Sequence, residues 1–315
     1  MKAIVSGASG FVGSRLVSEL IKNGYEVIAI GRRKIKLLSN YRRQLLVNSI
    51  YLDCNLNNLD YLKKTLSNLK FFGKDLHFFF HLAWGGNSGL SDMDVGSQSQ
   101  NIEYTLNSFK LAAKLKAKRY IFGGTMEEFF AERYTNLDYK IDKLFNRHVV
   151  YALAKISARQ GLKLLYKKKD PEILFVTSSH VMGPGDDRDS FLQVALTNIL
   201  KGKNIKMSSG KQNFDVVNVI DCAKAYLSVA KYGTFGSSYW IGSGKPRKLK
   251  FYIEKMNKIF SRVKIYYGAI PYNDVILDKK IFCTKKLFKD TKFEPIYSFS
   301  NTAKQVAEYL KNKKF

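Results

Sequence analysis

Residues 4–16 read IVSGASGFVGSRL, in which three glycines recur at intervals of three between an apolar run and an amphipathic one. Glycine is needed where a turn is tight, where the backbone approaches an anion, and where a helix packs close to the preceding strand. Residues 2–6 are typical of a buried parallel strand, and residues 11–23 of a helix that ends at Gly24. A glycine triplet alone is a weak signal, but this position between strand and helix indicates a nucleotide-binding turn.

The composition is that of a folded globular protein. The chain has 315 residues, of which 45% are hydrophobic and 14% aromatic, so it can bury a substantial core in one large or two modest domains. No apolar run reaches membrane-spanning length, and we therefore expect no membrane insertion. Because the chain enters its first strand without a signal peptide, we expect a cytoplasmic protein.

The charge is strongly positive, with 53 Lys and Arg against 26 Asp and Glu and a formal net charge of +27. Such an excess attracts nucleic acids, anionic membranes or phosphorylated substrates. The lysines are spread along the whole chain, which favours a solvated basic surface. The three cysteines and four histidines show no ligand spacing, so we expect neither a disulfide nor a metal site.

The apolar segments predict an α/β fold with a doubly wound parallel (Rossmann) sheet. The expected strands are residues 2–6, 26–30, 50–53, 76–81, 119–123 and 173–177, and the expected helices are 11–23, 59–69, 100–116 and 151–167. We expect a dinucleotide-binding domain at residues 1–179, to which residues 214–242 return. A smaller C-terminal substrate-binding lobe would comprise residues 180–213 and 243–315.

A tyrosine and a lysine four residues apart indicate acid/base chemistry. Tyr151 and Lys155 would lie on one helical face, one turn apart. A nearby ammonium favours the phenolate, so the phenol can exchange a proton with a substrate oxygen near neutral pH. Such pairs also occur by chance, but Thr125 follows the strand that ends at Gly123, where a hydroxyl would face the ligand crevice of such a sheet.

These motifs resemble those of the extended short-chain dehydrogenase/reductase superfamily, in its NAD(P)-dependent sugar epimerase/dehydratase group. The resemblance covers nearly the whole chain and also includes Asp53, HLA at 81–83, Asn101, GPG at 183–185, DVVNVIDCA at 215–223 and WIGSG at 240–244. It implies that Tyr151 is the proton donor or acceptor, that Lys155 tunes it and binds the nicotinamide ribose, and that Thr125 hydrogen-bonds the reacting oxygen. It also implies a nucleoside-diphosphate sugar substrate.

The same resemblance predicts the cofactor contacts, with Asp53 at the adenine. The predicted cofactor-binding residues are Gly7, Ser9, Gly10, Phe11, Val12, Gly13, Arg32, Arg33, Asp53, Cys54, Leu82, Ala83, Asn101, Tyr151 and Lys155. NAD-selective folds of this kind place a carboxylate after the second strand, whereas residues 31–34 read GRRK. Two arginines suit a 2′-phosphate through bidentate hydrogen bonds. We therefore predict NADP(H), with NAD(H) as the alternative.

Departures from the family pattern concern the substrate. The predicted substrate-binding residues are Trp84, Met126, Glu127, His180 and Phe214. Phe214 stands where relatives often carry an arginine that grips the substrate's phosphate or ribose, and His180 either contacts substrate or packs inside. Residues 210–215, GKQNFD, are similar to a branch of bacterial surface-polysaccharide enzymes that includes 4-keto-6-deoxysugar reductases of the CDP-abequose synthase kind.

We therefore predict an NAD(P)-dependent oxidoreductase acting at a ring carbon of a nucleotide sugar, with C4 as the expected position. A nucleotide-sugar 4-epimerase that retains its cofactor is the alternative, because it would use the same Tyr, Lys and Thr. A non-catalytic relative that binds RNA is a third interpretation, which the basic charge favours. Two observations disfavour RNA binding. An RNA-binding protein has no need of the intact set of Thr125, Tyr151 and Lys155, and the sequence shows no interleaved aromatic and basic residues of the RNA-recognition type.

Two further expectations concern elimination and assembly. Sugar 4,6-dehydratases of this family follow the threonine with an acid or hydroxyl residue and then a glutamate. Here Glu127 is preceded by Met126, whose thioether donates no proton, so we expect hydride transfer without elimination.

The helices at 100–116 and 151–167 resemble the pair that builds a dimer in this family. Ile102, Leu106 and Phe109 would supply the apolar face of a homodimer, unless that face only packs on the sheet.

Overall fold

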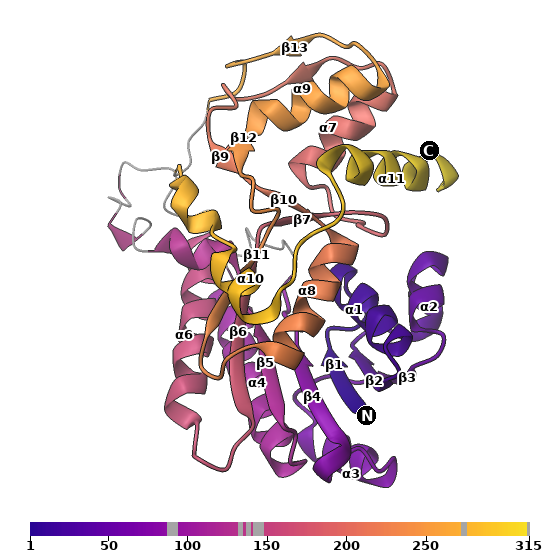
Figure 1. Cartoon of the computed structure of the whole chain (residues 1–315), viewed down its shortest axis with the longest axis vertical. Coiled ribbons are helices and arrows are strands. Elements are labelled where there is room, and N and C mark those ends of the chain that lie inside the picture. Colours follow the sequence, from indigo (N-terminus) through magenta and orange to yellow (C-terminus); the bar gives the residue numbers. More distant parts are fainter. Residues whose placement is uncertain (87–93, 132–134, 137–139, 141–147, 272–275, 314–315) are drawn as a thin grey trace. The chain divides into compact units, whose positions relative to one another are not determined.

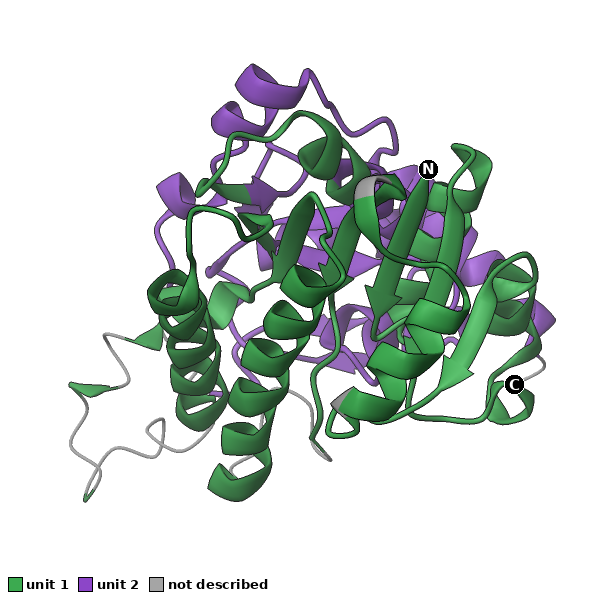
Figure 2. Ribbon diagram, turned by 90° about the horizontal axis from the view of Figure 1, so that it is seen from below, with its two compact units in different colours: residues 1–177, 226–239 green, residues 178–225, 240–315 purple. Residues whose placement is uncertain are grey.

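The computed structural model describes residues 1–86, 94–131, 135–136, 140, 148–271 and 276–313. The chain divides into two compact units (Figure 2). Unit 1 comprises residues 1–177 and 226–239, and unit 2 comprises residues 178–225 and 240–315. No helix among these described residues is long and apolar enough to cross a membrane.

A seven-stranded sheet has the strand order β11-β6-β5-β4-β1-β2-β3 (Figure 1). The strands are β1 (Lys2–Ser6), β2 (Glu26–Gly31), β3 (Ile50–Asp53), β4 (Leu76–His81), β5 (Arg119–Gly123), β6 (Glu172–Ser178) and β11 (Ser238–Ile241). All neighbouring pairs from β6 to β3 are parallel. Strand order reverses between β1 and β4, and ligands bind at such a switch point, beyond the carboxyl ends of the strands. The predicted doubly wound α/β fold is confirmed.

Helices alternate with these strands, as the apolar periodicity predicts. They are α1 (Phe11–Lys22), α2 (Asn40–Leu46), α3 (Leu59–Asn68), α4 (Val95–Lys114), α6 (Val149–Leu165) and α8 (Val219–Tyr232), with short 3-10 turns η1 (Ile35–Leu37), η2 (Gly73–Asp75) and η4 (Met126–Phe129). Helix α4 begins five residues earlier than the predicted range. The Asp94 carboxylate accepts hydrogen bonds from Gly96 N and Ser97 N and so caps a polar first turn that carries no apolar period.

An aromatic cluster fills the core between the sheet and α4. The ring of Tyr120 stacks on Phe79, with 5.6 Å between centroids, and meets the edge of Phe109 at 5.3 Å. Phe109 is only 1% exposed, so it belongs to this core and is not available for the dimer face that the sequence predicts. Ile102 and Leu106 are partly buried against the same core. This face of α4 therefore packs largely on its own sheet.

Unit 2 is built from small sheets and helices around a separate apolar core. Its elements are β7 (His180–Met182), α7 (Phe191–Leu200), β8 (Ile205–Lys206), β9 (Asn213–Phe214), β10 (Val216–Asn218), β12 (Arg247–Lys248), α9 (Leu249–Phe260), β13 (Ile265–Tyr266), η5 (Lys279–Phe282), α10 (Lys285–Thr291) and α11 (Phe299–Asn312). The core contains Leu192, Leu196, Ile253, Met256 and Val306. The small sheets pair β10 with β7, β12 with β9 and β13 with β8.

The sequence predicts that residues 214–242 return to the first domain. Within that range, unit 1 includes residues 226–239, and β11, at Ser238–Ile241, joins the seven-stranded sheet. Strand β10 pairs in parallel with β7 rather than with the seven-stranded sheet. Its apolar sequence, Val216 and Val217, is equally suited to a small buried sheet, so the strand pattern alone does not identify its partner.

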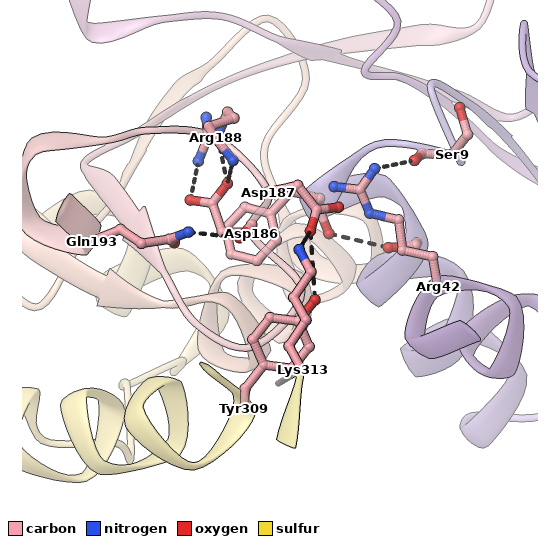
Figure 3. Close-up of polar contacts among 10 residues, drawn as sticks. Ser9, Arg42, Asp186, Asp187, Arg188, Gln193, Tyr309 and Lys313 are labelled. Carbon is pink, nitrogen blue, oxygen red and sulfur yellow. Dashed lines mark hydrogen bonds and ion pairs between the residues drawn. The ribbon is translucent and has the colours of Figure 1, made fainter. Parts of the chain in front are cut away.

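The turn after β7 is stabilised by a buried aspartate (Figure 3). Asp186 is 2% exposed and accepts hydrogen bonds from Arg188 Nε at 2.7 Å and Nη2 at 2.9 Å. Gln193 Nε2, on α7, donates to the Asp186 backbone oxygen at 2.9 Å. The neighbouring Asp187 accepts a hydrogen bond from Lys313 Nζ at 2.8 Å. These contacts join the Gly-Pro-Gly turn to the helices of unit 2.

Candidate active site

The glycine-rich turn leaves no room for side chains. Gly7 has φ +78°, and a Cβ atom there would lie 2.6 Å from the backbone of Leu82 and Ala83. A Cβ atom on Gly13 would collide with the Gly7 carbonyl oxygen. Gly10 N donates to Gly7 O at 2.9 Å, and Gly10 forms the N-cap of α1 without a side-chain cap. The result is a backbone-lined helix N-terminus, which fits a dinucleotide pyrophosphate.

The ends of β2 and β3, where the sequence predicts the adenine contact, lie side by side in the sheet. Tyr51 Oη donates to the Arg33 backbone oxygen at 2.6 Å, and a Cβ atom on Gly31 would collide with that hydroxyl. Cys54 N donates to Gly31 O at 3.0 Å, which places Cys54 beside the end of β2. Asp53 pairs with Gly31 in the sheet register. The sequence-based prediction overlooked Tyr51, although its position two residues before Asp53 was a usable signal.

Basic side chains surround the same turn. Arg32 and Arg33 are exposed after β2, where a dinucleotide's adenosine ribose meets such a sheet. Arg42, on α2, donates from Nη1 to the Ser9 backbone oxygen at 3.0 Å (Figure 3). Arg42 therefore stabilises the backbone of the turn at Ser9. The sequence offers no spacing signal for that contact, since 33 residues separate the two groups.

The loop after β4 is fastened to α4. Asn101 is 3% exposed, and its amide bonds the Gly85 backbone twice, accepting from Gly85 N at 2.6 Å and donating to Gly85 O at 2.9 Å. Trp84 Nε1 donates to Gln98 Oε1 at 2.8 Å. Leu82 and Ala83 pack against Gly7 from this loop. Asn101, predicted to bind the cofactor, thus positions the loop that faces the glycine turn.

His81, at the end of β4, has a structural role, because its ring forms hydrogen bonds with neighbouring elements. Its Nδ1 lies 2.9 Å from Ser6 Oγ and 3.1 Å from Ser108 Oγ, and its Nε2 lies 3.0 Å from Thr105 Oγ1. Burial, with the nearby Lys155 charge, lowers the pKa of His81 to about 3. The imidazole is therefore neutral and joins β1, β4 and α4.

Helix α6 carries Tyr151 and Lys155 one turn apart. Lys155 is 4% exposed, and its Nζ donates to the Gly123 backbone oxygen, at the end of β5, at 2.7 Å. The Trp84 ring covers the same ammonium, with 3.8 Å between Nζ and the ring centroid. The Trp84 and Tyr151 rings meet edge to face at 5.9 Å. Burial lowers the pKa of Lys155 to about 7, Glu128 opposes this and Arg159 adds to it.

Thr125 begins the 3-10 turn η4 directly after β5. Its Oγ1 accepts a hydrogen bond from Glu127 N at 3.3 Å, and its own N–H donates to Glu128 Oε1 at 2.8 Å. This reciprocal arrangement is a capping box, which fixes both the backbone and the hydroxyl of Thr125. Met126 is the first residue of η4, and its thioether side chain has no proton to donate.

Two adjacent glutamates of η4 have different buried partners. Glu128 Oε2 accepts from Arg159 Nε at 2.6 Å. Glu127, predicted to contact substrate, lies 3.0 Å from His148, between Oε2 and Nδ1, and both side chains are buried. The sequence-based prediction overlooked His148 and Arg159. His148 stands three residues before Tyr151, and Arg159 one helical turn after Lys155, so their positions on α6 were the available signal.

His180 and Phe214, predicted to bind substrate, both lie in unit 2. Their ring centroids are 5.3 Å apart. Burial, with Arg188 nearby, lowers the pKa of His180 to about 4, and its Nε2 has no hydrogen-bond partner among the described residues. Arg247 pairs with Phe214 across the antiparallel strands β12 and β9. Directly paired residues share a face of the sheet, so Arg247 and Phe214 lie on one face. The Arg247 guanidinium lies over the Phe251 ring, 5.8 Å from its centroid.

Comparisons with known proteins identify a family and several relatives. A model of the NAD dependent epimerase/dehydratase family matches residues 3–242. CDP-abequose synthase of Salmonella muenchen is 24% identical over 280 residues, which cover 87% of this chain and 86% of that protein. The dTDP-6-deoxy-L-talose 4-dehydrogenase (NAD(+)) of Aggregatibacter actinomycetemcomitans is 25% identical over 292 residues, which cover 86% and 95% of the two chains.

Solved structures support the fold. The crystal structure of a UDP-glucose 4-epimerase from Thermotoga maritima, solved with UDP-glucose, superposes with a TM-score of 0.80 at 20% identity and covers 99% of both chains. A UDP-glucuronic acid 4-epimerase from Bacillus cereus, in complex with NAD, gives a TM-score of 0.75 at 19% identity over the full length of both chains.

Proposed function

Because the chain belongs to the NAD dependent epimerase/dehydratase family, we propose that it is an NAD(P)-dependent oxidoreductase that acts at C4 of a nucleotide-activated sugar. The favoured reaction is reduction of a 4-keto-6-deoxysugar nucleotide. The similarity to a CDP-abequose synthase and to a dTDP-6-deoxy-L-talose 4-dehydrogenase supports this reaction class. A role in making sugars for surface polysaccharides is consistent with it.

The observation that carries the proposal is the arrangement of Tyr151, Lys155 and Thr125 around the end of β5. The Lys155 ammonium is bound to the Gly123 carbonyl oxygen, and Tyr151 lies one turn before it on α6. Thr125 follows two residues after Gly123 and is held by its capping box. These three side chains provide a phenol, a cation and a hydroxyl, the set needed for proton exchange with an alcohol or a ketone oxygen.

Each of these residues has a distinct task in the proposed reaction. Thr125 Oγ1 accepts the Glu127 N–H, which leaves the hydroxyl hydrogen to donate to the C4 oxygen. Tyr151 gives its proton to that oxygen during reduction and removes it during oxidation. Lys155 favours the phenolate and so eases the proton transfer. The dinucleotide, when bound, supplies the hydride.

The surroundings of Glu127 favour redox chemistry over dehydration. Elimination from C5 and C6 needs a base and an acid, and Met126 provides neither. Glu127 is buried against His148 at 3.0 Å. We therefore expect that no 6-hydroxy nucleotide sugar is converted to a 4-keto-6-deoxy product.

The basic groups after β2 support NADP(H) as the preferred cofactor. Arg32 and Arg33 are exposed and stand where an NAD-selective fold has a carboxylate. Guanidinium groups suit the 2′-phosphate, which carries the charge that distinguishes the two cofactors. NAD(H) is the alternative, and the similarity to a dTDP-6-deoxy-L-talose 4-dehydrogenase (NAD(+)) supports it.

The basic group beside Phe214 supports a phosphorylated substrate. Arg247 pairs with Phe214 across β12 and β9, and a guanidinium there can replace the arginine that relatives often carry at the position of Phe214. The predicted substrate contacts Trp84, Met126, Glu127, His180 and Phe214 remain part of this proposal.

We also propose a homodimer through α4 and α6. With Phe109 in the core, the exposed apolar residues of α6 are the better contact, namely Leu153 at 40% and Leu164 at 86% exposure. Light scattering at micromolar concentration tests this assembly. Leu164→Lys should convert the dimer to a monomer, and a monomeric wild-type protein would rule the dimer out.

The experiment for the reaction is incubation with CDP- and dTDP-linked 4-keto-6-deoxyhexoses and reduced cofactor, followed by NMR of the products. We expect one cofactor oxidised for each C4 ketone reduced. Interconversion of C4 epimers without net cofactor oxidation would instead identify the 4-epimerase alternative. Loss of water from a 6-hydroxy sugar would restore Glu127 as a catalytic base.

A further inference from the structure

Two side chains beside the proposed reacting groups determine the surroundings of Lys155. The Trp84 ring lies face-on to the ammonium at 3.8 Å. Its indole N–H is bound by Gln98 Oε1 at 2.8 Å, and Gln98 is only 1% exposed. Trp84 comes from the loop after β4 and Gln98 from α4. Neither residue exchanges a proton with a substrate in the proposed reaction.

We propose that Trp84, fixed by Gln98, is a positioning residue that holds the Lys155 side chain as a cation against the Gly123 carbonyl oxygen. The inference rests on the proposed function, because it explains how the lysine of the catalytic pair stays charged inside the protein. Trp84 thereby acts through Lys155 and requires no contact with the sugar.

Lys155 needs such a contact because its ammonium is buried. Lys155 is 4% exposed, and burial disfavours the charged form. One N–H finds the Gly123 carbonyl oxygen at 2.7 Å. The negative face of an aromatic ring attracts a desolvated cation, and Trp84 offers that face at a shorter distance than Phe122, whose centroid is 5.1 Å from Nζ.

Among the residues that the structure describes, the charged groups that act on the pKa of Lys155 are Glu128 and Arg159. On η4, the Glu128 carboxylate raises the pKa of Lys155, but it also accepts a hydrogen bond from Arg159, whose charge on α6 lowers that pKa. On β4, His81 is neutral because burial lowers its pKa to about 3. Tyr151, on α6, is a further titratable neighbour. The Glu128 carboxylate is shared with Arg159, whereas the indole face is a contact that can be removed without changing any charged group.

Helix α4 fixes the orientation of the ring. Gln98 and Asn101 are three residues apart on one face of α4. Gln98 binds the indole N–H of Trp84, and Asn101 binds both backbone polar groups of Gly85. Three hydrogen bonds thus hold two consecutive loop residues. The Trp84 and Tyr151 rings also meet at an interplanar angle of 90°, so one fixed indole contacts both members of the pair.

The test is the pH dependence of binding of the oxidised cofactor, measured by calorimetry from about pH 5.5 to pH 9.5, which brackets the titration expected of a perturbed lysine. Binding should weaken as the pH rises, with an inflection near the pKa of Lys155, which is about 7. Trp84→Leu should move the inflection about one unit lower, a tenfold change in the ionisation ratio. Trp84→Phe, which keeps a ring face, should move it less than Trp84→Leu.

Further variants separate position from general damage. Gln98→Leu removes the acceptor for the indole N–H without changing Trp84 itself. Loss of the fixed ring orientation should lower the inflection. Phe71→Leu is the matched control, because it removes a ring that lies over Lys2 at 5.1 Å in the same unit. The control should leave the inflection unchanged. If Trp84→Leu does not fold, Trp84→Phe and Gln98→Leu still decide the question.

The outcomes distinguish this inference from the proposed function. An inflection that is unchanged or higher in Trp84→Leu, Trp84→Phe and Gln98→Leu would overturn the role of Trp84, whatever the enzyme does with sugars. A lower inflection together with no turnover of any 4-keto-6-deoxysugar nucleotide would keep the role of Trp84 and overturn the proposed reaction.

Discussion

The glycine-rich turn and the end of β5 are both parts of unit 1, but they are built from different material. The turn is made of backbone and works because Gly7 and Gly13 have no side chains to fill it. The end of β5 is held by side chains, because Lys155 binds the Gly123 backbone oxygen and Arg159 binds the Glu128 carboxylate. Substitutions in the turn should therefore impair cofactor binding, whereas substitutions at the end of β5 should impair chemistry or stability, except at Lys155, whose charge should also affect cofactor binding.

The largest effect should come from Tyr151. Tyr151→Phe removes the proton that the C4 oxygen needs, so the turnover number should fall by a factor on the order of 10³ to 10⁴. Cofactor affinity should change little, because the glycine turn is untouched. Steady-state kinetics and calorimetry measure the two quantities separately. A comparable loss of cofactor affinity would show that the two regions are not independent.

A smaller effect, on stability rather than chemistry, is expected at the ion pair behind Thr125. Arg159→Met leaves the Glu128 carboxylate buried without its partner, which should cost about 3 kcal/mol in the free energy of unfolding. Urea unfolding measures this change. Adding Glu128→Gln to Arg159→Met removes the unpaired charge and should restore part of the lost stability. Equal stability of the wild type and Arg159→Met would contradict the importance of this pair.

The need for glycine in the turn is tested by Gly13→Ala, which adds a single methyl group. Gly13→Ala places a Cβ atom against the Gly7 carbonyl oxygen, so cofactor affinity should fall at least about a hundredfold, or about 2.7 kcal/mol. Gly24→Ala is the matched control. Gly24 has φ +77° but no atom within 4 Å of the added Cβ, so this variant should lose only about 1 kcal/mol of stability and should bind cofactor normally.

The smallest effect should be a change of cofactor preference. Replacing Arg32 and Arg33 with serine removes the groups proposed for the 2′-phosphate. NADPH affinity should fall roughly tenfold, because charge-assisted hydrogen bonds to phosphate are lost. NADH affinity should stay within a factor of about two to three, as expected for a ligand without that phosphate. Fluorescence titration with both cofactors measures the preference, and tighter binding of NADH by the wild type would refute it.

The backbone-built region could be predicted from sequence because its signals are local. Glycine spacing, a buried strand and a following helix all lie within residues 2–24. The sheet strands at 2–6, 76–81 and 119–123 have the predicted bounds, because continuous apolar runs of that length are typical of strands buried on both faces. The Tyr151 and Lys155 pair also depends only on helical spacing.

The side-chain-built region could be predicted only in part. Gln98 reaches Trp84 across 14 residues, and Arg159 reaches Glu128 across 31 residues. Such contacts depend on how α4 and α6 pack beside the loops that follow β4 and β5, and no periodicity encodes that packing. Phe109 also illustrates this limit. Its position on the helix is compatible with either a dimer face or the sheet, and only the structure shows that it packs on Tyr120.

The most direct test of the central claim is the transfer of a labelled hydride. The enzyme is incubated with a CDP-linked 4-keto-6-deoxyhexose and NADPH that carries deuterium at the transferred position, and the product is examined by NMR and mass spectrometry. The account predicts deuterium at C4 of the sugar, one for each cofactor oxidised, and no such product with Tyr151→Phe. A wild-type product that carries no deuterium at C4, or one that has lost water, would contradict it.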